Sequence, residues 1–141
     1  MNECPPGTLT VQVLSALHSV EVRLEARLDP IGLSLAKLGA LAKLAAAPEP
    51  LPLRTLAELC ACVRSNITQL VDRLEADKLV VRTDDPQDRR SVRAALTPEG
   101  RARHAAGMRI LEEAEQELLA RLSPEQQREL PPLLDVLRAW V

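Results

Sequence analysis

The chain has 141 residues, of which 46% are apolar and 27% charged, with a formal net charge of −2. This composition excludes a disordered chain and favours one soluble domain with a single main core. Trp140 is the only aromatic residue, so the core must be built from Leu, Val and Ala, which suits packed helices. Three cysteines do not suggest a disulfide framework. The absence of a secretory signal and of a long apolar run leads us to expect a cytoplasmic protein.

The charge is unevenly distributed along the chain. Residues 54–103 hold ten Arg or Lys and eight Asp or Glu, whereas the remainder holds eight basic and twelve acidic residues. A mildly basic middle between acidic flanks is weak evidence for a surface that binds nucleic acid, because phosphate affinity depends on the local field more than on net charge.

The N-terminal third predicts two helices. Apolar residues recur at steps of three and four over 8–28, which indicates an amphipathic helix. A second helix is expected over 35–47, capped by Ser34 and ended by the following proline. The prolines at 48, 50 and 52 leave room only for a very short strand around 51–53.

A helix-turn-helix pattern follows. Thr55 and Glu58 have the spacing of a capping box, which predicts a short helix over 55–61. A turn at 61–63 leads to a longer helix over 64–77. Its apolar stripe consists of Ile67, Leu70, Val71 and Leu74.

The apolar period then changes from 3.6 to 2 residues. Residues 79–83 and 91–96 read as two strands, and the stretch 84–88 between them has the composition of a turn. Together they predict a hairpin of the wing type with a polar, basic tip.

Two further helices are expected at the C-terminal end. Thr97 followed by proline opens a helix that runs to about 121. Ser123 opens the last helix by the same device, as part of a capping box. Pro131 and Pro132 are expected to kink or restart it.

This order of elements points to double-stranded DNA. The B-form major groove is about 12 Å wide and admits one helix, and Asn, Gln and Arg side chains pair with base edges there. An arginine at a narrow hairpin tip suits the minor groove. The candidate contacts are Arg64, Ser65, Asn66, Thr68, Gln69 and Arg73 on the helix and Arg89, Arg90 and Arg93 on the wing.

These residues resemble the MarR family of transcriptional regulators. The resemblance is carried by LAEL at 56–59, RSNITQLVDRLE at 64–75, LVVR at 79–82, DPQDRRSV at 85–92 and LTPEGR at 96–101. It covers about 30–122 in order. A lone helix-turn-helix pattern is a weak signal, but this wing followed by Leu-Thr-x-x-Gly is specific.

The resemblance implies a mainly α fold with a small β-hairpin wing, namely a winged helix-turn-helix lobe over 31–103 between dimerisation helices at 1–30 and 104–141. It implies a homodimer that reads a palindromic operator, with helix 64–77 in the major groove and wing 84–92 in the minor groove. The family further implies a ligand-responsive repressor with a small-molecule effector site between the two regions. In its wing pair, a carboxylate, here Asp88, orients an arginine, here Arg90.

Two departures from the family pattern affect these expectations. Val63 stands where a small capping residue is usual, so the start of the following helix is expected to be loose until DNA binds. The chain has no Phe or Tyr, which puts an aromatic-stacking effector site in doubt. Arg23 and His18 are guessed to reach the effector pocket, and His104 is expected to have a packing or surface role.

Two alternative functions remain open. The first alternative is a winged-helix module that binds a protein instead of DNA. The second is a DNA-binding regulator that senses oxidants through Cys4, Cys60 or Cys62. Cys60 and Cys62 align with apolar core positions, and free cysteine is among the most buried residue types. No nucleophile triad, phosphate loop or metal cluster is recognisable, so we expect neither an enzyme nor a cofactor or metal.

Overall fold

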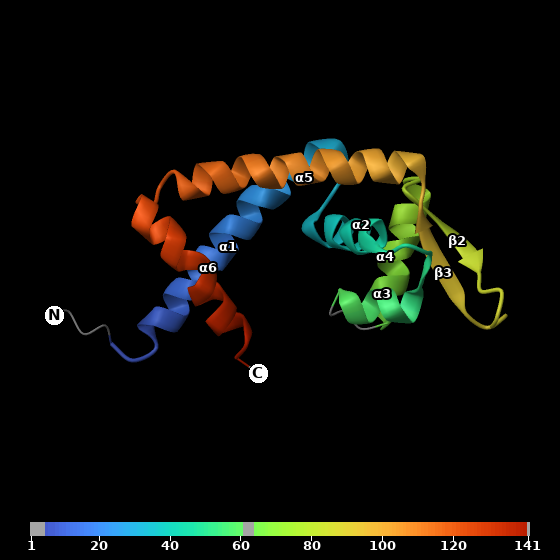
Figure 1. Ribbon diagram of the computed structural model, residues 1–141, viewed down its shortest axis with the longest axis horizontal. Coiled ribbons are helices and arrows are strands. Elements are labelled where there is room, and N and C mark those ends of the chain that lie inside the picture. The colour runs from blue at the N-terminus through green and yellow to red at the C-terminus, as the bar shows by residue number, and fades with distance from the viewer. Residues whose placement is uncertain (1–4, 61–63, 141) are drawn as a thin grey trace.

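The computed structural model describes residues 5–60 and 64–140, the side chains of residues 64 and 65 excepted. This part of the chain is mostly helical with one small sheet (Figure 1). The helices are α1 (Thr8–Leu28), the 3-10 helix η1 (Asp29–Ile31), α2 (Leu35–Ala46), α3 (Leu53–Leu59), α4 (Arg64–Ala76), α5 (Pro98–Leu119) and α6 (Pro124–Arg138). The strands are β1 (Leu51–Pro52), β2 (Val80–Asp84) and β3 (Val92–Leu96).

The elements fall into two regions joined by α5. Figure 1 shows α1 and α6 beneath one end of this long helix, and α2, α3, α4 and the hairpin beneath the other end. We call residues 31–103 the lobe, and α1 with the C-terminal part of α5 and α6 the arm. In the described part of the chain, no helix has the length and apolar character needed to cross a membrane.

The sheet is antiparallel, with β3 in the middle and β1 and β2 on either side. In the hairpin, Val80 pairs with Leu96 and Asp84 with Val92. Leu51 of β1 pairs with Ala94. The predicted hairpin and short strand are confirmed, with ends within a residue or two of those expected.

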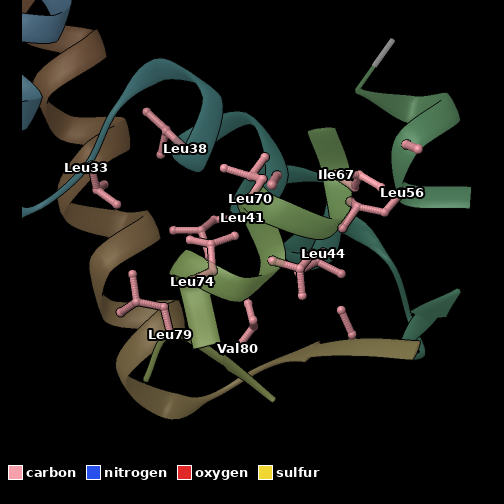
Figure 2. Close-up of a cluster of buried hydrophobic side chains, with 14 of the residues drawn as sticks. Leu33, Leu38, Leu41, Leu44, Leu56, Ile67, Leu70, Leu74, Leu79 and Val80 are labelled. Atoms are coloured by element: carbon pink, nitrogen blue, oxygen red, sulfur yellow. The ribbon is translucent and has the colours of Figure 1, made fainter. Parts of the chain in front are cut away.

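The core of the lobe is formed by the apolar stripe of α4. Ile67, Val71 and Leu74 have no exposed surface, and Figure 2 shows α4 packed with its leucines toward Leu41 and Leu44 of α2. The predicted stripe is therefore confirmed. Complete burial of such a side chain contributes about 1.5–3 kcal/mol, so this contact fixes which surface of α4 remains exposed.

Three helices begin at the predicted caps. Ser34 accepts a hydrogen bond from the backbone N–H of Lys37 at the start of α2. Thr97 accepts one from Gly100 at the start of α5. Ser123 and Gln126 form a complete capping box at the start of α6. Each of these caps joins residues that lie within four positions of one another, so the local sequence is enough to predict where the helix begins.

The capping box expected at Thr55 is wrong. Helix α3 begins at Leu53, its N-cap is Pro52 without a side-chain cap, and Thr55 lies inside the helix. Glu58 instead forms an ion pair with Arg54, at 3.6 Å. The pairing of β1 with β3 delivers the chain directly into the helix. Helix formation from Leu53 packs this residue against the core, which a start at Thr55 would not do.

The expected restart of the last helix is also not observed. Helix α6 runs without interruption from Pro124 to Arg138 and contains Pro131 and Pro132. A proline ring fixes φ near a helical value and removes one backbone donor. Both prolines are exposed, so water can satisfy the carbonyl groups that lose their intrahelical partner.

Candidate nucleic-acid interface

One flank of α4 carries exposed polar side chains that no other element covers. Asn66, Gln69 and Arg73 are exposed and recur at i, i+3 and i+7, so they lie along one side of the helix. They are three of the residues predicted to meet base edges. The side chains of Arg64 and Ser65, also predicted contacts, lie outside the described residues.

The other polar flank of α4 faces the wing. Thr68, Asp72 and Glu75 share this flank by spacing, and the two carboxylates bind Arg82 of β2. The polar surface of α4 is thus divided between a flank open to solvent and a flank engaged with the hairpin. The predicted contact Thr68 lies on the second flank, next to the acidic residues.

The wing tip presents two arginines to solvent. Arg89 and Arg90 lie in the turn between β2 and β3 and are both exposed. Within residues 5–60 and 64–140, no carboxylate forms an ion pair with either guanidinium. Their positive charge is therefore available to a phosphate or a groove edge.

Asp88 shapes the backbone of this turn. Its Oδ1 accepts the backbone N–H of Arg90 at 3.0 Å, and its carbonyl oxygen accepts the N–H of Ser91. The sequence predicted that this carboxylate orients the Arg90 side chain. The contact present is to the Arg90 backbone, so an orienting contact to the guanidinium stays a prediction.

Arg93 lies deeper in the hairpin than Arg89 and Arg90. It is half-buried, and its guanidinium pairs with Asp85 at 3.2 Å. Asp85 also accepts the backbone N–H of Gln87. The pKa of Asp85 lies below its usual range because Gln87 donates this hydrogen bond and because Arg93 lies beside it. The pair braces the turn, so any contact of Arg93 with DNA stays a prediction.

The start of α4 and the wing tip lie at the same end of the lobe. In Figure 1 the start of α4, helix α3 and the tip of the hairpin lie away from α5. A helix and a hairpin tip at one end can enter adjacent grooves of a duplex.

Comparison with known proteins identifies the family. A sequence profile described as the MarR family matches residues 31–91. A probable transcriptional regulator from Pseudomonas aeruginosa is 32% identical and superposes with a TM-score of 0.76, over 92% of this chain and 98% of that chain. The chain belongs to the MarR family of transcriptional regulators. A search of curated proteins found no match.

More distant structures share the MarR-family fold. A MarR-family transcriptional regulator from Rhodococcus sp. RHA1 is 23% identical, with a TM-score of 0.82 and coverage of 99% of both chains. MepR from S. aureus in complex with DNA is also 23% identical, with a TM-score of 0.82, over 99% of this chain and 100% of that chain. The winged helix-turn-helix predicted from the sequence is confirmed.

This MarR-family chain has a groove between α1 and α5 in the arm. The groove has a volume of about 650 Å³, with an apolar floor that includes Leu24, Met108 and Leu111. Arg23 lines it, together with Glu112 and Arg121. The sequence placed Arg23 at an effector pocket between the two regions, and that assignment stays a prediction. His18 does not line this groove and borders a separate hollow near the start of α2.

The cysteines and His104 show no assembled site among the described residues. Cys60 is half-buried and packs against the core of the lobe, as expected of a core cysteine. Cys4, Cys62 and Val63 lie outside the described residues. His104 is half-buried on α5. No group of three or more His, Cys, Asp or Glu side chains in the described chain could hold a metal ion.

Four functional candidates were missed by the sequence reading: Asp72, Glu75, Arg82 and Asp85. Each is a common surface residue in sequence, and each acquires a role only through a partner on another element or across a turn. The one available signal was that two carboxylates lie four and seven residues after Thr68 on a helix expected to meet phosphates.

Proposed function

We propose that this chain is a sequence-specific DNA-binding repressor that acts as a homodimer. In this proposal α4 enters the major groove, the wing over 84–92 enters the minor groove, and the operator is palindromic. The observation that carries the proposal is that the start of α4, a helix with an exposed polar flank, lies at the same end of the lobe as the arginine-bearing wing tip.

The dimensions and chemistry of this end of the lobe support DNA binding. Helix α4 has 13 residues and is therefore about 20 Å long. The diameter of an α-helix with its side chains is about 10–12 Å, which fits the major-groove width of about 12 Å. Asn66 and Gln69 suit adenine, and Arg73 suits guanine. Arg89 and Arg90 suit the minor groove, where negative potential increases as the groove narrows.

A second copy of the chain is the proposed occupant of the apolar arm. Leucine and valine side chains of α1 and α6 are exposed, and α6 has no buried residue. An apolar surface of this extent is rare on a monomer. Twofold pairing of the arms would present two copies of α4 to a palindrome, with half-sites about 34 Å apart.

The dimer is tested with one charge introduced on each face of α6. Leu137→Glu places a carboxylate on the apolar face and is expected to yield a monomer in light scattering. Arg128→Glu places the same residue on the polar face and is expected to remain dimeric. A native chain that is monomeric at every accessible concentration would contradict the assignment of the arm.

DNA binding is tested by gel shift with a duplex from the region upstream of the protein's own coding sequence. An unrelated duplex of equal length is the control, and selection from a random duplex pool supplies a second probe. Two chains are expected per duplex, with affinity that falls steeply as salt rises. Binding with no preference for any sequence would favour the alternative of a winged-helix module that binds protein.

The wing is tested by one substitution. Arg90→Ala is expected to weaken binding of the selected duplex by about 1–3 kcal/mol. Arg101→Ala removes the same charge on the side of the lobe near α5 and serves as the matched control. Equal affinity of Arg90→Ala and native protein at fixed salt would contradict the minor-groove assignment.

The groove between α1 and α5 is the proposed effector site. Its apolar floor and its arginine and glutamate rim fit a small amphipathic molecule, and anilinonaphthalene sulfonate is a suitable probe. A ligand changes DNA affinity only if it binds one arrangement of the dimer better than the other. The dye is expected to weaken duplex binding by native protein but not by Ala114→Leu, which fills the groove. Equal responses would place the dye elsewhere.

A further inference from the structure

Arg82 joins the middle of the wing to helix α4. Its Nη1 donates to Oε1 of Glu75 at 2.9 Å, and its Nη2 donates to Oδ1 of Asp72. The other oxygen of Glu75 accepts the backbone N–H of Arg82 at 3.1 Å. One guanidinium thus spans two carboxylates on successive turns of α4, and the strand backbone adds a third contact.

These contacts attach strand β2 of the hairpin to α4, in addition to the pairing of β3 with β1. The root of the hairpin is fixed by Leu79, Val80 and Ala94, which have no exposed surface. Beyond the root, Thr83 and Asp84 of β2 are exposed. Arg82 lies between these regions, opposite Ala94, on β2 at the edge of the sheet, whereas β3 is held on its other side by β1.

The charges around Arg82 argue against a direct contact with DNA. Its side chain is 25% exposed, whereas those of Asp72 and Glu75 are 59% and 43% exposed. The pKa of Arg82 is raised because Asp72 and then Glu75 accept its hydrogen bonds. A guanidinium shared by two carboxylates has little attraction left for a phosphate. Carboxylates on a DNA-facing helix repel phosphates, so we expect these two to serve another purpose.

We propose that Arg82 is a positioning residue that holds the wing at one setting relative to α4, so that both reach their grooves in a single register. This inference rests on the proposed function, because it assumes that α4 and the wing bind one duplex together. A planar fork that satisfies two acceptors fixes orientation as well as distance. Pairs this exposed contribute little to stability, so their main effect is on geometry.

Asp72→Asn distinguishes a purely electrostatic role of this carboxylate from a role in positioning the wing, because the two predict opposite changes in DNA affinity. Removal of a negative charge from a DNA-facing helix raises DNA affinity if electrostatics alone matters. If the bridge positions the wing, Asp72→Asn lowers affinity for the duplex selected by native protein roughly tenfold. The loss should be absent for an unrelated duplex, for which register is irrelevant. Unchanged or increased affinity for the selected duplex would overturn the proposal.

Arg82→Lys tests geometry at constant charge. A single ammonium group cannot span both carboxylates, so this variant is expected to lose affinity for the selected duplex even though its charge and its unfolding midpoint are nearly native. Arg101→Gln, which removes a charge near α5, is the control for net charge. An Arg82→Lys variant with native affinity would overturn the role of the bridge.

The dependence of the wing on Arg82 is measured directly with Arg90→Ala. In a wing held at one setting, Arg90 contributes its full contact, so Arg90→Ala lowers affinity strongly. In the Arg82→Lys background, Arg90→Ala should cause a several-fold smaller loss of affinity for the selected duplex. An equal loss in both backgrounds refutes positioning by Arg82 but leaves the proposed function intact, whereas failure of the native protein to select any duplex refutes the proposed function itself.

Discussion

The lobe and the arm use similar leucine-rich helices in opposite ways. In the lobe, Leu41, Leu56 and Leu74 are completely buried against neighbouring elements. In the arm, Leu14, Leu134 and Leu137 are each more than half exposed. Both regions have the apolar periodicity of amphipathic helices, so periodicity alone does not reveal which helices find a partner within the chain.

The two regions differ in whether their apolar surface is covered by other parts of the same chain. The lobe closes its own core through α2, α4 and the sheet (Figure 2). The arm is joined to the lobe by α5, by Leu28 of α1, which is buried in the core of the lobe, and by a hydrogen bond from the backbone N–H of Leu35 to Glu25. A region with a closed core can fold by itself, whereas an open apolar face gains stability only from another copy.

The largest expected effect contrasts one leucine from each region. Leu41→Ala leaves a cavity in the lobe and should lower the free energy of unfolding by about 4 kcal/mol at every protein concentration. Leu134→Ala should act only through association, so its effect should vanish at dilutions where the native chain is monomeric. Denaturant unfolding over a range of concentrations measures both. An equal, concentration-independent loss in Leu134→Ala would show that α6 packs on its own chain.

The next effect concerns the junction between lobe and α5. A Cβ on Gly100 would lie 2.0 Å from the carbonyl oxygen of Leu79, so Gly100→Ala must separate α5 from the root of β2. We expect a loss of about 3 kcal/mol of unfolding free energy. Gly39→Ala is the matched control, because a Cβ there meets nothing within 4 Å and alanine favours the helix by about 1 kcal/mol. Similar stabilities of the two variants would contradict this packing.

The smallest effect concerns the ion pair that ties the arm together. Arg27 donates to Glu117 and lowers the pKa of this carboxyl group. The ionised form is therefore favoured by folding. Its contribution to stability is present above the ordinary pKa of glutamate and is lost as pH falls through the lowered pKa. Both side chains are substantially exposed, so the contribution is small.

Glu117→Gln should therefore have a slightly lower unfolding midpoint than native protein at neutral pH. The difference should disappear in acid, below the lowered pKa of Glu117. Glu49→Gln, on the loop after α2, is the control. A difference that grows as the pH falls would show that the pair is not stabilising in its ionised form.

Sequence reading succeeded where the signal was local. The caps at Ser34, Thr97 and Ser123 and the buried stripe of α4 depend on residues within a few positions of one another, so their physics is contained in a short segment. It failed at Thr55, where the pairing of β1 with β3 decided the start of the helix. The restart expected at Pro131 is not observed, because the fixed φ of proline is itself helical and α6 continues through both prolines.

The candidate site was predicted as residue types, not as an arrangement. Asn66, Gln69, Arg73, Arg89 and Arg90 are exposed as a DNA contact requires, and their contact with DNA stays a prediction. Thr68 shares a flank of α4 with Asp72 and Glu75, and Arg93 pairs with Asp85 of the turn. Nothing in the sequence pairs Arg82 with Asp72, because their proximity depends on how β2 returns along α4.

The helices, the hairpin and the family could be predicted from the sequence, because periodicity, caps and the wing motif are properties of neighbouring residues. The packing of distant segments sets which flank of α4 is open, which arginines are held by carboxylates and which apolar faces stay uncovered. Those outcomes depend on distances between segments far apart in the chain, and no pattern of neighbouring residues specifies such distances.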